Sequence, residues 1–174
     1  MLRFGIIDQV DAAKGRVRVR FEEDDILSDW LPMMQSGTLK NKNYSMPDVN
    51  EHVVCLMDER AENGAVLGAV YNNQDATPYT SANKFGTKYE NGDEFSYDRA
   101  ARKLLQKINT VEFSLESDGP TLKKGADTLK SILVELLDIL IAHTHPTGTG
   151  PSGPPVQATN LTANKNKINN FFKA

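Results

Sequence analysis

Alternating apolar and polar residues predict short β-strands over the first 70 residues. Residues 16–21 alternate arginine with valine or phenylalanine, which is the period of a half-buried strand. A strand at residues 4–10 precedes it, and Gly15 can take the positive φ of the intervening turn. Further strands are expected at residues 29–34, 52–58 and 66–70. Five short strands that begin with a hairpin predict a small Greek-key barrel of the OB type, over residues 1–73.

Several side chains of this barrel have two interpretations. Trp30 is the largest core candidate, although a tryptophan can also stack on single-stranded nucleic acid. The arginines of residues 16–20 should face solvent, and the acidic residues 22–25 directly after them argue against a nucleic-acid stripe. Cys55, the only cysteine, should be a buried hydrophobe, and His52 a hydrogen-bonded residue at the barrel rim.

A second β-region follows a polar linker at residues 74–85. Its short strands are expected at residues 85–90, 94–98, 103–108 and 111–116. They hold too few apolar residues for a globular core of their own. The same strands of other chains could supply the missing apolar contacts by wrapping with them into an intertwined β-prism, which also removes exposed sheet edges. We assign residues 86–120 to this part, and Gly119 and Pro120 should end it.

From residue 126 the apolar period becomes helical. One broad face collects Leu129, Ile132, Leu133, Leu136, Leu137, Ile139 and Leu140. Four of these approach a heptad seam (Leu129, Leu133, Leu136 and Leu140), so a short coiled coil and ordinary helix packing are both open. Residues 158–172 predict a second, weak helix that could fold back on the first through Leu161, Ile168, Phe171 and Phe172. Residues 121–174 would thus form a helical hairpin.

His143 and His145 lie between these helices, just before the Pro-Gly-rich residues 147–155. Pro146 favours an extended His145, and alternate residues of an extended chain share a face. Three chains on one axis would supply six imidazole nitrogens, a set that suits iron, nickel or copper better than tetrahedral zinc. Solvated histidines beside helix carbonyls are the simpler alternative. A catalytic metal site would need further ligands and a general base.

Composition narrows the function classes. The 174 residues are 39% hydrophobic with mean hydropathy −0.46, which suggests an elongated or oligomeric protein. A net charge of −3 exerts no strong pull on nucleic acid. The longest apolar run is too short to cross a bilayer, and no apolar signal-peptide segment begins the chain, so we expect a cytoplasmic start. No catalytic fingerprint is present, and we expect neither an enzyme nor a small-molecule substrate.

Several motifs in order resemble the phage baseplate assembly protein V family, the central spikes of contractile tails. The family is related to R-type pyocin spikes and to VgrG proteins of type VI secretion. The resemblance rests on the residues GIIDQVD (5–11), GRVRVRF (15–21), SDWLP (28–32), PDVNEHV (47–53) and GAVLGAVYN (64–72). Residues 87–117 resemble the family's short β-helix in character only, and residues 143–155 resemble its HxH-plus-GPP ends.

The resemblance implies a homotrimeric, membrane-piercing spike. Its OB collar would dock on the baseplate hub, a triple-stranded β-helix would follow, and the target envelope would be a transient partner. In some members an HxH near the apex binds iron, which would make His143 and His145 ligands of one structural ion per trimer. The location would be a virion or tail-like particle, assembled in the host cytoplasm.

One departure and one rival interpretation accompany the resemblance. Needle-like members end soon after the HxH, whereas 29 residues follow His145 here, so the apex could be blunt. The rival is an OB-fold binding module for single-stranded nucleic acid or oligosaccharide, which would need a basic groove and exposed aromatic residues.

Overall fold

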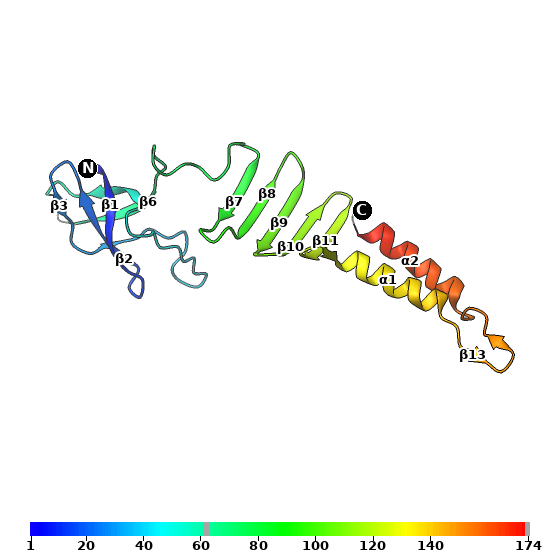
Figure 1. Ribbon diagram of the computed structural model, residues 1–174. Helices are drawn as coiled ribbons and strands as arrows, with labels where there is room; N and C mark the ends of the chain where they lie inside the picture. The colour runs from blue at the N-terminus through cyan, green and yellow to red at the C-terminus, as the bar shows by residue number, and fades with distance from the viewer. Residues whose placement is uncertain (61–62, 173–174) are drawn as a thin grey trace. The chain divides into compact units, whose positions relative to one another are not determined.

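A computed structural model describes residues 1–60 and 63–172. The chain forms two compact units, Met1–Thr77 and Pro78–Ala174 (Figure 1). It is mainly β, with two helices. In the part of the chain that is described, neither helix is long and apolar enough to cross a membrane.

The first unit is a small, strongly curved antiparallel sheet. Strand β1 (Leu2–Asp11) pairs with β2 (Arg16–Phe21) across the turn at Gly15, whose φ is +64°. The strand order is β3-β2-β1-β5-β6, with β4 also paired to β2. The remaining bounds are Ile26–Leu27 (β3), Leu31–Pro32 (β4), His52–Met57 (β5) and Gly64–Ala69 (β6). A parallel bridge between Met33, directly after β4, and Val66 of β6 brings the two ends of this sheet together.

The barrel core is built from alternate residues of the strands, whose side chains point inward as period-two alternation predicts. Its members are Ile7, Val17, Val19, Phe21, Leu31, Val53, Cys55, Met57 and Val66. The arginines of β2 point outward, as predicted, and Arg18 and Arg20 are paired. Arg20 contacts Asp8 at 2.6 Å, and Arg18 Nε donates to the Ser28 carbonyl at 2.9 Å. Pairing with carboxylates raises the pKa of Arg20, and the largest cause is its hydrogen bond to Asp8.

The expected strand at residues 29–34 is wrong in extent, and Trp30 is not a core residue. Ser28 and Asp29 make local hydrogen bonds: Ser28 Oγ donates to the Asp29 carbonyl at 2.7 Å, and Asp29 Oδ1 accepts from Trp30 N at 2.7 Å. Such bonds compete with strand pairing, so the strand begins only at Leu31. Leu31 takes the inward position with 2% exposure, and its neighbour Trp30 is left half-buried outside the core.

Cys55 is fully buried, as predicted, and burial raises the pKa of its thiol to about 11. Because only the thiolate reacts, a two-unit rise from the ordinary value of 9.0 lowers the thiolate fraction at pH 8 about 100-fold. We expect a maleimide to label the folded chain at least that much more slowly than the urea-unfolded chain. Equal labelling rates would show that the β5 core is open.

The second unit begins with a single antiparallel meander, drawn from β7 to β11 in Figure 1. Its bounds are Lys84–Lys88 (β7), Glu94–Asp98 (β8), Lys103–Ile108 (β9), Val111–Glu116 (β10), Gly119–Lys124 (β11) and Asp127–Thr128 (β12). Four strands lie within two residues of their predicted positions. The predicted end at Gly119 and Pro120 is wrong, because both belong to β11. Strand β12 pairs only with Lys123 and Lys124, so Pro120 lies where a missing N–H interrupts no β11–β12 pairing.

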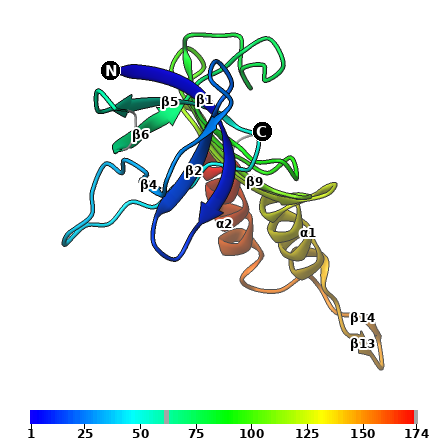
Figure 2. The ribbon, with the colours of Figure 1, turned by 90° about the vertical axis from the view of Figure 1, so that its left-hand side faces the viewer.

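Two antiparallel helices end the unit. Helix α1 (Leu129–Ala142) is capped by Thr128, whose side chain accepts from Ser131 N, and α2 (Ala158–Phe171) returns along it. A small hairpin of β13 (Pro146–Thr147) and β14 (Gly150–Pro151) joins them and extends past their ends in both Figures 1 and 2. Leu161, Ile168 and Phe172 are half-buried as expected, whereas Phe171 is 63% exposed.

Candidate functional site

The two histidines of the HxH motif come directly after α1. His143 caps the helix with extended dihedral angles (φ −62°, ψ 129°), because the helix ends before the Pro-Gly-rich segment. His145 is fixed by two bonds to Ser152: its N–H donates to Ser152 Oγ at 2.8 Å, and its carbonyl accepts from Ser152 N at 2.7 Å. The hairpin β13–β14 therefore holds the second histidine in place beside the first.

The two imidazoles converge on one point. Their Nε2 atoms are 3.2 Å apart, with the ring centroids 4.6 Å apart and the ring planes at 89°. Two nitrogens bound to one metal at about 2.0–2.1 Å lie about 2.8–3.0 Å apart at a right angle and about 3.3–3.4 Å apart at the tetrahedral angle. The observed 3.2 Å lies between these two ranges, and a shared N–H···N hydrogen bond would also give this spacing.

One chain supplies only part of a metal site. Among residues 1–60 and 63–172, no group of three or more His, Cys, Asp or Glu side chains is placed to hold a metal ion. His143 and His145 are both solvent-exposed. His52 belongs to the other unit, where its Nδ1 lies 2.6 Å from Asn72 Nδ2 and 3.4 Å from Asp75, so it is satisfied there as predicted. A metal on the HxH pair would need further ligands from outside this chain.

The meander has one apolar face, which we call the apolar sheet face. Strand register aligns one row of Phe85, Tyr97, Leu104, Leu115 and Pro120, and a second row of Thr87, Phe95, Gln106, Phe113 and Leu122. The sequence predicted the shared face of most of these side chains. Phe85 is 54% exposed and Phe95 48%. A large apolar surface of this kind marks an interaction site.

The opposite face is charged and covered by its own side chains. Opposite charges alternate across neighbouring strands, with ion pairs Lys84–Glu94 at 3.2 Å, Lys103–Glu116 at 3.0 Å and Lys123–Glu112 at 3.1 Å. Between these rows Ser96 and Ser114 are only 2% and 3% exposed. The polar face thus suits water, whereas residues 1–60 and 63–172 leave the apolar face uncovered.

Glu94 gives this charged face a measurable acid dependence. The hydrogen bond from Ser96 at 2.5 Å is the main cause that lowers its pKa below 4.5; Lys84 adds to it and partial burial opposes it. A lowered folded-state pKa stabilises the fold above pH 4.5, and this stability is lost as pH falls through the lowered value. We expect the urea concentration at the unfolding midpoint to fall less in Glu94→Gln than in the unaltered protein as the pH is lowered from 6 to 2. If the pH dependence of the midpoint is unchanged, other carboxylates cause the loss of stability in acid.

The first unit carries an exposed apolar patch where β1 and β5 pair, which we call the collar patch. Leu2 lies opposite Leu56, and both are more than half exposed, as is Phe4 at 63%. The charged residue of this strand, Arg3, instead turns inward, where it is 8% exposed, pairs with Asp24 and lies 4.3 Å from the Phe21 ring centroid. Sequence reasoning missed this patch, although the run Met1-Leu2-Arg3-Phe4 carries its signal.

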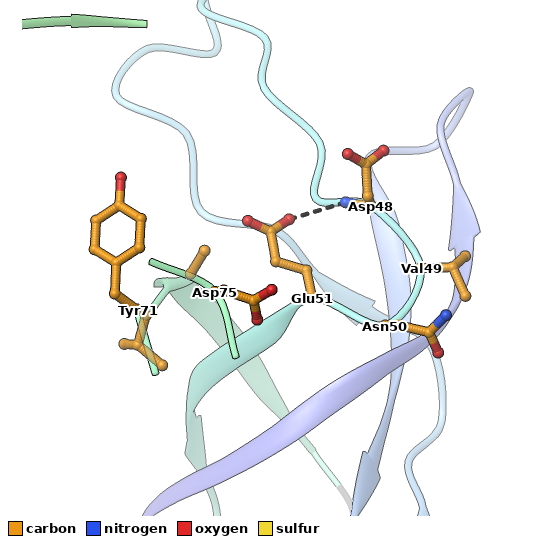
Figure 3. Close-up of a pocket in the computed structure, with 8 residues that line it drawn as sticks. Asp48, Val49, Asn50, Glu51, Tyr71 and Asp75 are labelled. Atoms are coloured by element: carbon orange, nitrogen blue, oxygen red, sulfur yellow. Dashed lines mark hydrogen bonds between the residues drawn. The ribbon is translucent and has the colours of Figure 1, made fainter. Parts of the chain in front are cut away.

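A pocket of about 470 Å³ also opens on the first unit, between the turn before β5 and the segment after β6 (Figure 3). Its rim carries Asp48, Glu51 and Asp75, and Glu51 accepts a hydrogen bond from Asp48 N at 2.9 Å. Three carboxylates repel phosphate. The sequence did not predict this pocket, because only the adjacency of β5 and β6 brings its two loops together.

Comparison with known proteins agrees with this architecture. Residues 3–71 match the model of one family, described as the type VI secretion system/phage-baseplate injector OB domain. The match covers β1 to β6 of the first unit. No curated protein matches the chain. This match confirms the resemblance to baseplate assembly protein V over residues 3–71, which are similar to the phage-baseplate injector OB domain.

Proposed function

We propose that this chain is the central spike of a contractile injection machine and acts as a homotrimer. The injector OB family supports a structural role in a baseplate. The uncovered apolar sheet face is the observation that carries the trimer. A one-layer sheet needs a second layer on its apolar side, and the described residues of the chain leave Phe85, Phe95 and Tyr97 at least 41% exposed.

Three copies solve this problem in a simple way. Three sheets around a common axis would turn their apolar faces inward and their alternating charges outward, forming the short triple-stranded β-helix that the family resemblance implies. Residues buried in this way would include both apolar rows, while ion pairs such as Lys103–Glu116 remain in solvent. The spike would then transmit force to a target envelope by its stiffness, which is a mechanical role that needs no reaction.

The collar patch is our candidate for the contact with the baseplate hub. Leu2, Phe4 and Leu56 form an apolar patch on the outside of the barrel that matches the family. We expect Phe4→Asp to abolish co-purification with the hub protein of the same particle while the mass of the spike is unchanged. Asp8→Asn, on the same strand outside the patch, serves as the control. Loss of the trimer in Phe4→Asp would instead place the patch between spike copies.

For the HxH pair we propose one structural transition-metal ion per trimer, with iron as the first candidate. The converging Nε2 atoms of His143 and His145 support a chelating pair, and three pairs would complete six-coordination. When bound, such an ion would cross-link three chain segments and offer no open position for substrate. Ser152 would hold the backbone that carries the second ligand, because its hydroxyl accepts a hydrogen bond from His145 N.

The nucleic-acid or sugar-binding alternative receives less support. Arg18 and Arg20 of β2 are paired with a carbonyl and a carboxylate group, respectively, and the pocket on the barrel is acidic. Location in the particle tests the spike function. A peptide tag at the C-terminus, decorated with antibody, should appear on the central axis below the baseplate in electron micrographs. Label found only at the sheath or the capsid would overturn the proposal.

A further inference from the structure

Helix α1 has two apolar faces, and α2 covers only one of them. Leu133, Leu137 and Ile141 are half-buried on the side that faces α2. On the other side Ile132, Leu136 and Ile139 are 54%, 51% and 61% exposed. These three residues, with Leu129 before them, form a continuous stripe that we call the α1 seam.

The spacing of the α1 seam is that of a coiled coil. Leu129, Ile132, Leu136 and Ile139 follow one another at intervals of three, four and three residues, which places leucine at both a positions and isoleucine at both d positions. This choice disfavours two-stranded coils and shifts the preference to three or four strands. The next a position is His143. The seam differs from the heptad that the sequence suggested, because Leu133 faces α2.

Helix α2 is built as an outer layer. Its half-buried residues form one narrow stripe of Ala158, Leu161, Lys165, Ile168 and Phe172, and the rest of its surface is mainly asparagine, threonine and lysine. Lys165 pairs with Asp138 at 2.6 Å, and Lys130 Nζ lies 3.4 Å from the Asn169 carbonyl and 3.3 Å from that of Phe172. These contacts hold α2 on the outer side of α1, so within one hairpin it leaves the seam open.

The α1 seam is continuous with the apolar sheet face. A pocket of about 360 Å³ lies where they meet, and its lining joins Val111 and Leu122 of the sheet to Leu129 and Ile132 of the helix. A surface that extends unbroken from sheet to helix is most simply covered by one partner with the same succession of elements. Another copy of this chain has that succession.

We propose that three α1 helices form a parallel coiled coil through this seam, surrounded by three α2 helices in a six-helix bundle. This inference rests on the proposed trimer and commits to two further copies of the chain as the occupants of the seam. It places His143 as the last core layer, so the coiled coil sets the spacing of the imidazoles. The bundle gives the spike a blunt helical segment before the β13–β14 hairpin.

Cysteine cross-linking tests the bundle in the full-length chain. Ile139→Cys and Leu136→Cys place thiols in the seam, and Ala163→Cys places one on the exposed side of α2 as the matched control. The buried native Cys55 makes the unaltered chain a blank. A short bis-maleimide should give a two-chain product at both seam positions, roughly tenfold or more above Ala163→Cys, because the bundle holds the thiols at high effective concentration.

Sedimentation of the same samples separates the two proposals. Trimers in which neither seam variant cross-links above Ala163→Cys overturn the helix bundle and leave the spike proposal standing. If the unaltered protein sediments with the mass of one chain, both the trimer and the bundle are overturned. Cross-linking at either seam position in folded trimers, as judged by unchanged helical circular dichroism, supports the bundle even if the other substitution disturbs folding.

Discussion

Replacing Phe95 by aspartate is expected to convert three-chain assemblies into single chains. Phe95 is 48% exposed in one chain, so the substitution costs the isolated sheet little. In a trimer it would remove the burial of the exposed half of this side chain from every copy, about 0.7–1.5 kcal/mol each, or roughly 2–4 kcal/mol per trimer. It would also place three carboxylates near one axis, which adds repulsion and desolvation cost.

Thr110→Asp is the matched control for this prediction. Thr110 is exposed in the turn between β9 and β10, so the same charge enters the same meander away from the apolar sheet face. Light scattering at micromolar concentration should show full mass for Thr110→Asp and a single-chain mass for Phe95→Asp. A Phe95→Asp protein that keeps the mass of the unaltered chain would show that the apolar sheet face lies outside any interface.

The second large effect is loss of bound metal in the double variant His143→Ala, His145→Ala. If the HxH pairs of three chains hold one ion, elemental analysis of protein purified from iron-supplemented cells should find about one transition-metal ion for three chains, and close to none in the variant. The melting temperature of the unaltered protein should also fall on treatment with a strong chelator, because bound metal stabilises only the folded state.

His52→Ala is the control here, because His52 lies in the other unit and has its own partners, Asn72 and Asp75. It should keep the full metal content. A double variant that retains its metal would remove His143 and His145 from the site. Metal-free unaltered protein that stays metal-free after incubation with ferrous, nickel or zinc salts would show that the two imidazoles merely share a hydrogen bond.

The strands were predictable from sequence wherever the alternation is regular. Arg16 to Phe21 gives both the strand and its inward face, and strands β8 to β10 fall within a residue of their expected limits. The prediction was less successful where local hydrogen bonds or edge positions override the pattern. The local bonds of Ser28 and Asp29 shorten the strand that would have buried Trp30, and Pro120 is tolerated in β11 where β12 does not pair.

The HxH pair was predictable as residues but not as geometry. An extended conformation before Pro146 follows from the sequence, whereas the 3.2 Å approach of the two Nε2 atoms is a side-chain arrangement that the spacing of the motif does not encode. The α1 seam was hidden for a related reason. Apolar residues cover more than half of the helix wheel, and only the position of α2 shows which of them remain uncovered.

The collar patch and the acidic pocket depend on strand neighbours that are distant in sequence. Leu2 meets Leu56 because β1 pairs with β5, and Asp48 and Asp75 share a rim because β5 pairs with β6. No local pattern encodes these adjacencies. They follow from the topology of the barrel, which the motifs of the injector OB family identify.

Sedimentation equilibrium of the full-length chain tests the central claim most directly. One chain has a mass of 19.3 kDa, and the account predicts a single species of three times that mass whose proportion does not fall on dilution through the micromolar range. A species with the mass of one chain under the same conditions would contradict it, because the apolar sheet face and the α1 seam would then both be exposed to water in the folded protein.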